Sequence, residues 1–296
     1  MKNPFTWLGF AAVLCWSFCG PLVRTAVERM PLLTFAALLQ GLSFLVLCAW
    51  TLARRQSLAA ALRPSRRKLV VASLYLAYSL LTNLLIRRAD GHETVLVLLL
   101  LINLWPAVAL AFGAAMFRDR LGAWFGIGVL FTLAGGFLLI GEGSISLTPF
   151  LAGLARQPFV IGGALVAACT WALCSNFMKK WPEEGEEFMV FNMGLAAIVL
   201  TLMSAPGVAH HVATLDFPPV LLAVAGFNAA GFLCWEIGLR KGSAPTVITA
   251  AYFIPVLTAL ASVWYFHLPL TITLLIAAVC VTAGALISRR SVQAAA

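Results

Sequence analysis

Ten apolar runs divide this chain, and each is long enough to cross a lipid bilayer as a helix. A helix needs about 20 apolar residues to cross about 30 Å of hydrocarbon, where every backbone N–H and C=O group must find a partner inside the protein. The chain is 62% hydrophobic and 10% charged, with a mean hydropathy of +0.97, which is far from the usage of soluble domains. The sequence therefore predicts an all-α integral membrane protein.

Charge clusters and Pro/Gly turns separate the runs. The predicted spans are 6–26, 31–53, 69–88, 94–117, 121–141, 159–180, 188–204, 218–239, 243–266 and 270–288. The first run is too long for the apolar part of a signal peptide and has no convincing small-residue cleavage site. We expect it to be retained as a helix.

Basic residues are distributed unevenly between the two sides of these spans. Fifteen of the twenty Lys and Arg residues fall on the side of the termini, and five fall on the other side. Cytoplasmic loops carry an excess of Lys and Arg, so the sequence predicts that both termini are cytoplasmic. Membrane orientation accounts for the net charge of +9, and no nucleic-acid partner is needed to explain it.

The sequence has no residue pattern that supports an enzyme, a cofactor site or a metal site. The seven cysteines all fall inside spans, where they act as small hydrophobic residues. The acidic run Glu183, Glu184, Glu186 and Glu187 is expected to be a solvated cytoplasmic loop and not a metal site. None of the eleven acids lies at a span midpoint, which disfavours a proton-coupled exporter of organic cations.

The two halves of the chain, 1–150 and 151–296, resemble each other weakly but in order. Trp16-Ser-Phe-Cys19 in span one matches Trp171-Ala-Leu-Cys174 in span six, and Pro106 in span four matches Pro255 in span nine. Five spans per unit is an odd number, so the second unit enters the membrane from the opposite side. Such inverted repeats are a common transporter plan with the substrate near the midplane.

Tryptophans fall into two populations along the predicted spans. Trp16, Trp105 and Trp171 lie near span midpoints, whereas the remaining tryptophans, such as Trp50 and Trp264, lie near span ends, as an interfacial belt requires. A midplane tryptophan can fill a gap between helices or line a cavity. The amides Asn103 and Asn228 at similar depth favour a cavity, because an unpaired polar group in hydrocarbon is costly.

Helical spacing adds a polar and aromatic stripe to span three, where Tyr75, Tyr78, Ser79 and Thr82 share one face. The residues predicted to bind substrate are Trp16, Ser17, Tyr75, Tyr78, Ser79, Asn103, Trp105, Trp171, Asn228 and Tyr252. Pro106 and Pro255 are predicted hinges, because each removes a backbone N–H and can kink its helix. Glycines and alanines in spans five and ten predict close helix packing away from the substrate.

The pattern resembles the drug/metabolite transporter superfamily of the EamA type, and within it the bacterial exporters of aromatic amino acids. Trp16-Ser17, Leu104-Trp105-Pro106 and Tyr252-Phe-Ile-Pro255 carry the resemblance. Where the exporter pattern reads Asn-Tyr-Leu-Trp-Pro, this chain has Ile102-Asn103-Leu-Trp-Pro, so the amide stands one residue later and replaces a tyrosine. The resemblance implies ten helices and alternating-access export of amino acids and related metabolites across the bacterial inner membrane, without a cofactor.

Three alternatives stay open at the level of the sequence. A broad metabolite or drug exporter of the same superfamily would share these features. A membrane-embedded enzyme acting on lipids belongs to another class, and an assay of hydrolysis or group transfer would distinguish it. A receptor-like or structural subunit is disfavoured by the polar midplane. Proton antiport and facilitated efflux are equally compatible with the residues, and the oligomeric state is open, with a monomer plausible.

Overall fold

The computed structural model describes residues 4–117, 120–140, 152, 155–181, 188–242, 247, 250–290 and 292–293. The acidic run from Glu183 to Glu187 and the boundary between the two predicted repeats at 150 and 151 lie outside these residues.

Helices make up nearly all of the described chain, and they follow the predicted spans closely. The long helices are α1 (Phe5–Val27), α2 (Leu32–Ala53), α4 (Arg66–Arg88), α5 (Gly91–Ile102), α6 (Trp105–Phe117), α7 (Ala123–Ile140), α9 (Pro158–Lys180), α10 (Phe188–Met203), α12 (Pro219–Lys241), α14 (Ile254–Phe266) and α15 (Ile272–Arg290). Shorter elements are α3 (Leu58–Ala61), α11 (Ala205–Thr214) and the two-residue strands β1 (Arg120–Leu121) and β2 (Val292–Gln293), which pair antiparallel. The predicted fold class, an all-α integral membrane protein, is confirmed.

Five helical segments of the described chain are long and apolar enough to cross a membrane: α1, α2, α4, the α5–α6 segment and Pro158–Met178 of α9. The pair α10 and α11, bent by 100° at their junction, makes a sixth if it is taken as one span. Shorter apolar helices lie in α7, α12, α14 and α15, within the remaining predicted spans. The count of ten spans stays a prediction.

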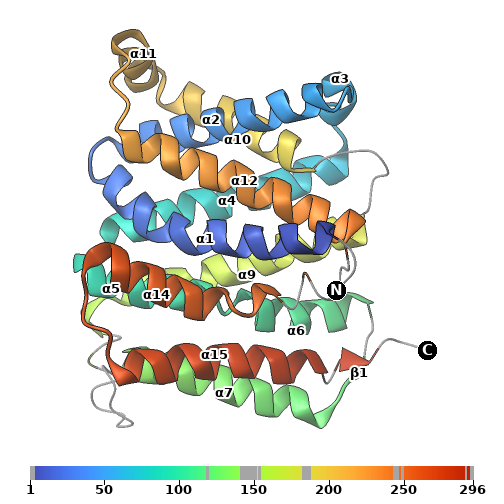
Figure 1. Cartoon of the computed structure of the whole chain (residues 1–296), viewed down its shortest axis with the longest axis vertical. Coiled ribbons are helices and arrows are strands. Elements are labelled where there is room, and N and C mark those ends of the chain that lie inside the picture. Colours follow the sequence, from blue (N-terminus) through green and yellow to red (C-terminus); the bar gives the residue numbers. More distant parts are fainter. Residues whose placement is uncertain are drawn as a thin grey trace.

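The long helices run side by side across the long axis of the molecule, and both termini lie at the same end of the bundle (Figure 1). The most extensive packing joins α1 to α12, α7 to α15, α2 to α10 and α4 to α9. Every one of these pairs joins a helix of the first half of the sequence to a helix of the second half. The halves are therefore interleaved, and their shared interface runs through the middle of the molecule.

Two helices begin in the middle of predicted spans rather than at their ends. Between α5 and α6 the chain forms a turn at Asn103 and Leu104, and a matching turn at Tyr252 and Phe253 precedes α14. Pro106 is the second residue of α6, and Pro255 is the second residue of α14. In place of the expected kink within a continuous helix, α5 ends and α6 begins across the first turn, and α14 begins after the second. The first turn of a helix tolerates proline because the N–H groups there have no partner within the helix.

The helices α7 and α15 approach each other through small residues, as expected for spans five and ten. A Cβ atom added to Gly128 would lie 2.5 Å from the carbonyl oxygen of Gly284, and one added to Gly135 would lie 2.7 Å from that of Ala277. The outer faces of this pair are apolar and exposed, with Trp124 at 63% and Ile272 at 70%. These faces suit contact with lipid.

We expect Gly128→Ala to destabilise the protein by roughly 1–3 kcal/mol, because the new methyl group forces two backbones apart. Thermal unfolding of the purified protein in detergent, followed by tryptophan fluorescence, measures the change. Gly126→Ala is the matched control, because a Cβ atom at Gly126 meets nothing within 4 Å. Equal unfolding midpoints for the two variants would show that this close approach does not stabilise the fold.

Candidate functional site

A cavity of about 150 Å³ lies beside the break between α5 and α6. Residues of six further helices, α1, α2, α4, α9, α12 and α14, complete its lining. Its lining residues are Trp16, Cys19, Gly20 and Val23 of α1; Leu39 and Gln40 of α2; Tyr75, Tyr78, Ser79, Thr82, Asn83 and Ile86 of α4; Leu99 and Ile102 of α5; Asn103; Trp105 of α6; Trp171 of α9; Val224, Asn228 and Phe232 of α12; and Ile254 and Thr258 of α14. None of these side chains carries a formal charge. The cavity is thus a neutral pocket of aromatic, amide, hydroxyl and apolar groups.

Most of the side chains predicted to bind substrate lie together on this cavity: Trp16, Tyr75, Tyr78, Ser79, Asn103, Trp105, Trp171 and Asn228. Two do not. Ser17 is buried within α1, where its hydroxyl donates to the Val13 carbonyl at 2.8 Å, and Tyr252 is buried outside the lining. Neighbouring helical residues point about 100° apart, so the position next to Trp16 cannot share its direction. The binding role of all ten residues stays a prediction.

Aromatic rings form the part of the wall that joins α1, α4, α9 and α12. Phe232 is at the centre of this group, with ring centroids 5.2 Å from Trp16, 5.9 Å from Tyr75 and 5.8 Å from Trp171. Trp171 also lies 5.0 Å from Tyr78 and 6.3 Å from Trp105. Most of these contacts are edge-to-face or tilted, which is the favourable geometry for aromatic pairs. The rings therefore support one another in fixed orientations.

Exposure differs between the buried Trp171 and several tryptophans near span ends. Trp171 is 6% exposed, whereas Trp124 and Trp264, near span ends, are 63% and 68% exposed. Trp235 stands behind Trp16 with ring centroids 5.2 Å apart, and it does not line the cavity. Trp16, Trp105 and Trp171 belong to the cavity wall, whereas Trp7, Trp50, Trp124 and Trp264 are exposed.

A chain of hydrogen bonds crosses from α4 to α2 and back beside the rings. The Tyr75 hydroxyl donates to Oε1 of Gln40 at 2.9 Å, and Nε2 of Gln40 donates to Oγ of Ser79 at 2.9 Å. Gln40 is 1% exposed, so these bonds form where water is excluded. They hold the α4 stripe in one orientation toward the cavity.

A second set of bonds anchors Asn228. Its Nδ2 donates to Oγ of Ser43 at 3.1 Å, and the Ser43 hydroxyl donates to the Ala225 carbonyl at 3.3 Å. Asn103 follows the last residue of α5, and its backbone N–H donates to the Leu99 carbonyl at 3.1 Å. Both amides are therefore positioned by their own helices or by a neighbour.

Sequence reasoning missed several lining residues, among them Gln40, Asn83, Phe232 and Thr258. The sequence could have pointed to Gln40, because an amide in an apolar span needs a hydrogen-bond partner. Asn83 continues the α4 stripe one turn beyond Ser79, and Phe232 lies one turn beyond Asn228. The sequence did not distinguish Thr258, because a threonine in a membrane helix often bonds only to the backbone of its own helix.

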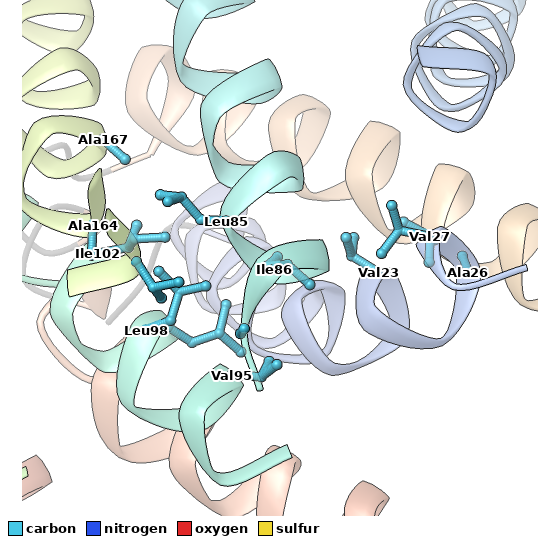
Figure 2. Packing of buried hydrophobic residues seen from close by; sticks show 14 of the residues in the cluster. Val23, Ala26, Val27, Leu85, Ile86, Val95, Leu98, Ile102, Ala164 and Ala167 are labelled. Carbon is cyan, nitrogen blue, oxygen red and sulfur yellow. The ribbon is translucent and has the colours of Figure 1, made fainter. Parts of the chain in front are cut away.

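Apolar clusters flank the cavity along the helix axes. At the end away from the termini, Val23 of α1, Ile86 of α4 and Ile102 of α5 lie both on the cavity and in a buried cluster (Figure 2). Toward the other end, Tyr75, Trp171 and Phe232 belong to a second cluster. The cavity therefore lies between two dry layers of side chains.

Charged groups sit beyond these layers and are paired with backbone carbonyls. Arg24 donates through Nη1 to the carbonyls of Ile86 at 2.6 Å and Ala89 at 2.8 Å, and its Nε lies 2.6 Å from Glu28. Cations are favourable at the C-terminus of a helix, here α4. Arg24 thereby ties α1 to α4 just past the cavity.

The comparisons with known proteins agree with this arrangement. The EamA-like transporter family model matches residues 5–141 and 158–290, so the chain belongs to the EamA-like transporter family. The chain is 24% identical to the aromatic amino acid exporter YddG of Salmonella typhimurium, over 95% of each chain, and 21% identical to YddG of Escherichia coli, over 97% of each. A solved crystal structure superposes with a TM-score of 0.63 at 22% identity, covering 98% of both chains.

The fold and the family define a multi-pass transporter of the inner membrane that acts on small molecules. Its class is that of a transporter and not of an enzyme. The cavity fits this class, because its rings and neutral polar groups line a space between helices from both halves of the chain.

We expect Gln40→Leu to destabilise the protein by roughly 1–3 kcal/mol, because it removes the side-chain oxygen that accepts from the buried Tyr75 hydroxyl. Adding Tyr75→Phe removes that hydroxyl and restores part of the loss, so the two substitutions are non-additive. Thermal unfolding of the wild type, both single variants and the double variant in one detergent measures the coupling. Additive changes would show that the bond between Tyr75 and Gln40 contributes nothing to stability.

Proposed function

We propose that this protein exports aromatic and other neutral amino acids by alternating access around the cavity. The observation that carries the proposal is the composition of the cavity wall: an aromatic cluster centred on Phe232 together with neutral amides and hydroxyls, and no charged side chain among the described lining residues. The similarity to exporters of aromatic amino acids supports the same substrate class.

A free amino acid has a zwitterionic head and a variable tail, and the two parts need different surroundings. The tail of phenylalanine or tryptophan is a flat apolar ring, which packs well among fixed rings such as Trp16, Trp171 and Phe232. The head is neutral overall, so a site without net charge accepts it provided that donors and acceptors are present. The cavity offers both kinds of surface within a single space.

The ammonium group has two kinds of partner on the cavity wall. The faces of Trp16, Trp105 and Trp171 attract a cation through their ring quadrupoles. In addition, Pro106 has no N–H to offer the Ile102 carbonyl, four residues earlier, and Ile102 lines the cavity. A carbonyl at a helix break is a suitable acceptor for an ammonium group.

In the proposed transport cycle, the backbone bends at the two helix breaks. Asn103 and Leu104 interrupt one span, Tyr252 and Phe253 interrupt another, and each break lies next to the cavity and is followed by a proline. Turns of this kind absorb changes in backbone angle more easily than intact helices. We therefore assign Pro106 and Pro255 to hinges, with both termini on the cytoplasmic side.

The test is uptake of labelled phenylalanine and tryptophan into proteoliposomes. We expect Trp105→Ala and Asn103→Ala each to lower the initial rate at least about tenfold, because each removes a group that contacts the bound substrate. Trp124→Ala is the matched control, since Trp124 is 63% exposed on α7 away from the cavity. Wild-type rates in both cavity variants would overturn this site assignment.

A substrate screen in the same proteoliposomes, with and without a proton gradient, tests the wider proposal. Transport of neutral amino acids supports it, whereas transport restricted to other metabolites or drugs favours a different member of the same class. A lipid-modifying activity without any transport would contradict the proposal and the assignment to the transporter class.

A further inference from the structure

Polar side chains on the α4 wall, among them Ser79 and Asn83, have donor groups for which the described residues offer no acceptor. Asn83 lines the cavity and is 4% exposed, and its Nδ2 has no hydrogen-bond partner. Ser79, one turn earlier, is 9% exposed, and its Oγ accepts a bond from Gln40. No acceptor for the Ser79 hydroxyl proton is found among the described residues. Buried donors are nearly always paired in proteins, so unpaired ones beside a cavity point to a ligand.

The hydrogen bonds of Gln40 determine the direction of the Ser79 hydroxyl proton. The Tyr75 hydroxyl occupies Oε1 of Gln40, and Nε2 of Gln40 points its hydrogen at Ser79. Ser79 must then direct its own proton away from Gln40. Tyr75 and Gln40 therefore act as positioning residues that keep the Ser79 hydroxyl available as a donor.

The spacing of Ser79 and Asn83 suits a carboxylate. Residues four apart on a helix are neighbours on one face, with their Cβ atoms about 6 Å apart. Two adjacent donors match the two oxygens of a carboxylate, and hydrogen bonds to an ionised group are stronger than neutral ones. Arg24 at the same end of α4 is already paired with Glu28, so the two donors and not a free positive charge recognise the carboxylate.

We propose that Ser79 and Asn83 form the carboxylate-binding subsite of the cavity. The head of the substrate then lies against α4, and its ring lies among Trp16, Trp171 and Phe232. This inference rests on the proposed function and adds the group that is recognised. The subsite selects amino acids over the corresponding amines, which have the same ring and ammonium group but no carboxylate.

The experiment compares labelled phenylalanine with labelled phenethylamine, its analogue without the carboxylate, in proteoliposomes. We expect Asn83→Leu and Ser79→Ala each to raise the KM for phenylalanine by about tenfold, since each removes one bond to a charged group. The KM for phenethylamine stays within about twofold of the wild-type value, because the amine makes neither bond. Asn83→Asp places a carboxylate in the subsite, so it repels phenylalanine and improves uptake of phenethylamine.

Asn192→Ala is the matched control. Asn192 is a fully buried asparagine on α10 and does not line the cavity. We expect this variant to keep the wild-type KM for both compounds. The gain of amine uptake in Asn83→Asp is a result that misfolding cannot produce, so it keeps the test decisive where another variant is unstable.

The outcomes distinguish the two proposals. If the wild type transports no neutral amino acid, the proposed function fails and the subsite fails with it. If the wild type transports phenylalanine but the variants raise both KM values equally, or Asn83→Asp gains nothing for the amine, the proposed function stands and the carboxylate subsite is overturned.

Discussion

The absence of water from the hydrocarbon core is the constraint on which this structure depends. A polar group there needs a partner inside the protein, so the backbone is helical and charged side chains bond to carbonyls. Lys68 illustrates this near one end, where its fully buried Nζ donates to the carbonyls of Ala61 at 2.8 Å and Arg63 at 3.2 Å. Arg24 does the same near the other end. Against this background, the unpaired Nδ2 of Asn83 at the cavity is the observation on which the proposed subsite rests.

The two halves of the chain are interleaved, and the cavity lies between helices from both halves. The helix pairs α1–α12, α2–α10, α4–α9 and α7–α15 each join one half to the other, so a movement of one half against the other changes the walls of the cavity. Close glycine contacts hold α7 to α15, and neither helix contributes a described residue to the cavity lining. The contact between α7 and α15 and the cavity lining are thus formed by different helices of the same bundle.

Some groups of the cavity wall are held in place by contacts within the protein, and others have hydrogen-bond donors without an acceptor. The rings around Phe232 contact one another, and the bonds of Tyr75 and Gln40 order one face of α4. Ordering these groups in the empty protein lowers the entropic cost of binding. The Ser79 hydroxyl and the Asn83 amide have donors without an acceptor among the described residues. In the proposed subsite, the substrate carboxylate supplies this acceptor.

The sequence alone determined the class of the fold, because apolar length and charge distribution act along the chain. It also identified most of the aromatic and amide residues on the cavity, since tryptophan and asparagine are unusual at midspan. Only the tertiary structure decided which face of each helix meets the cavity. It therefore separated Trp16 from Ser17, left Tyr252 outside the lining, and added Gln40, Asn83, Phe232 and Thr258. Helix rotation and partner choice depend on contacts between segments far apart in the chain, and a single sequence records those contacts weakly.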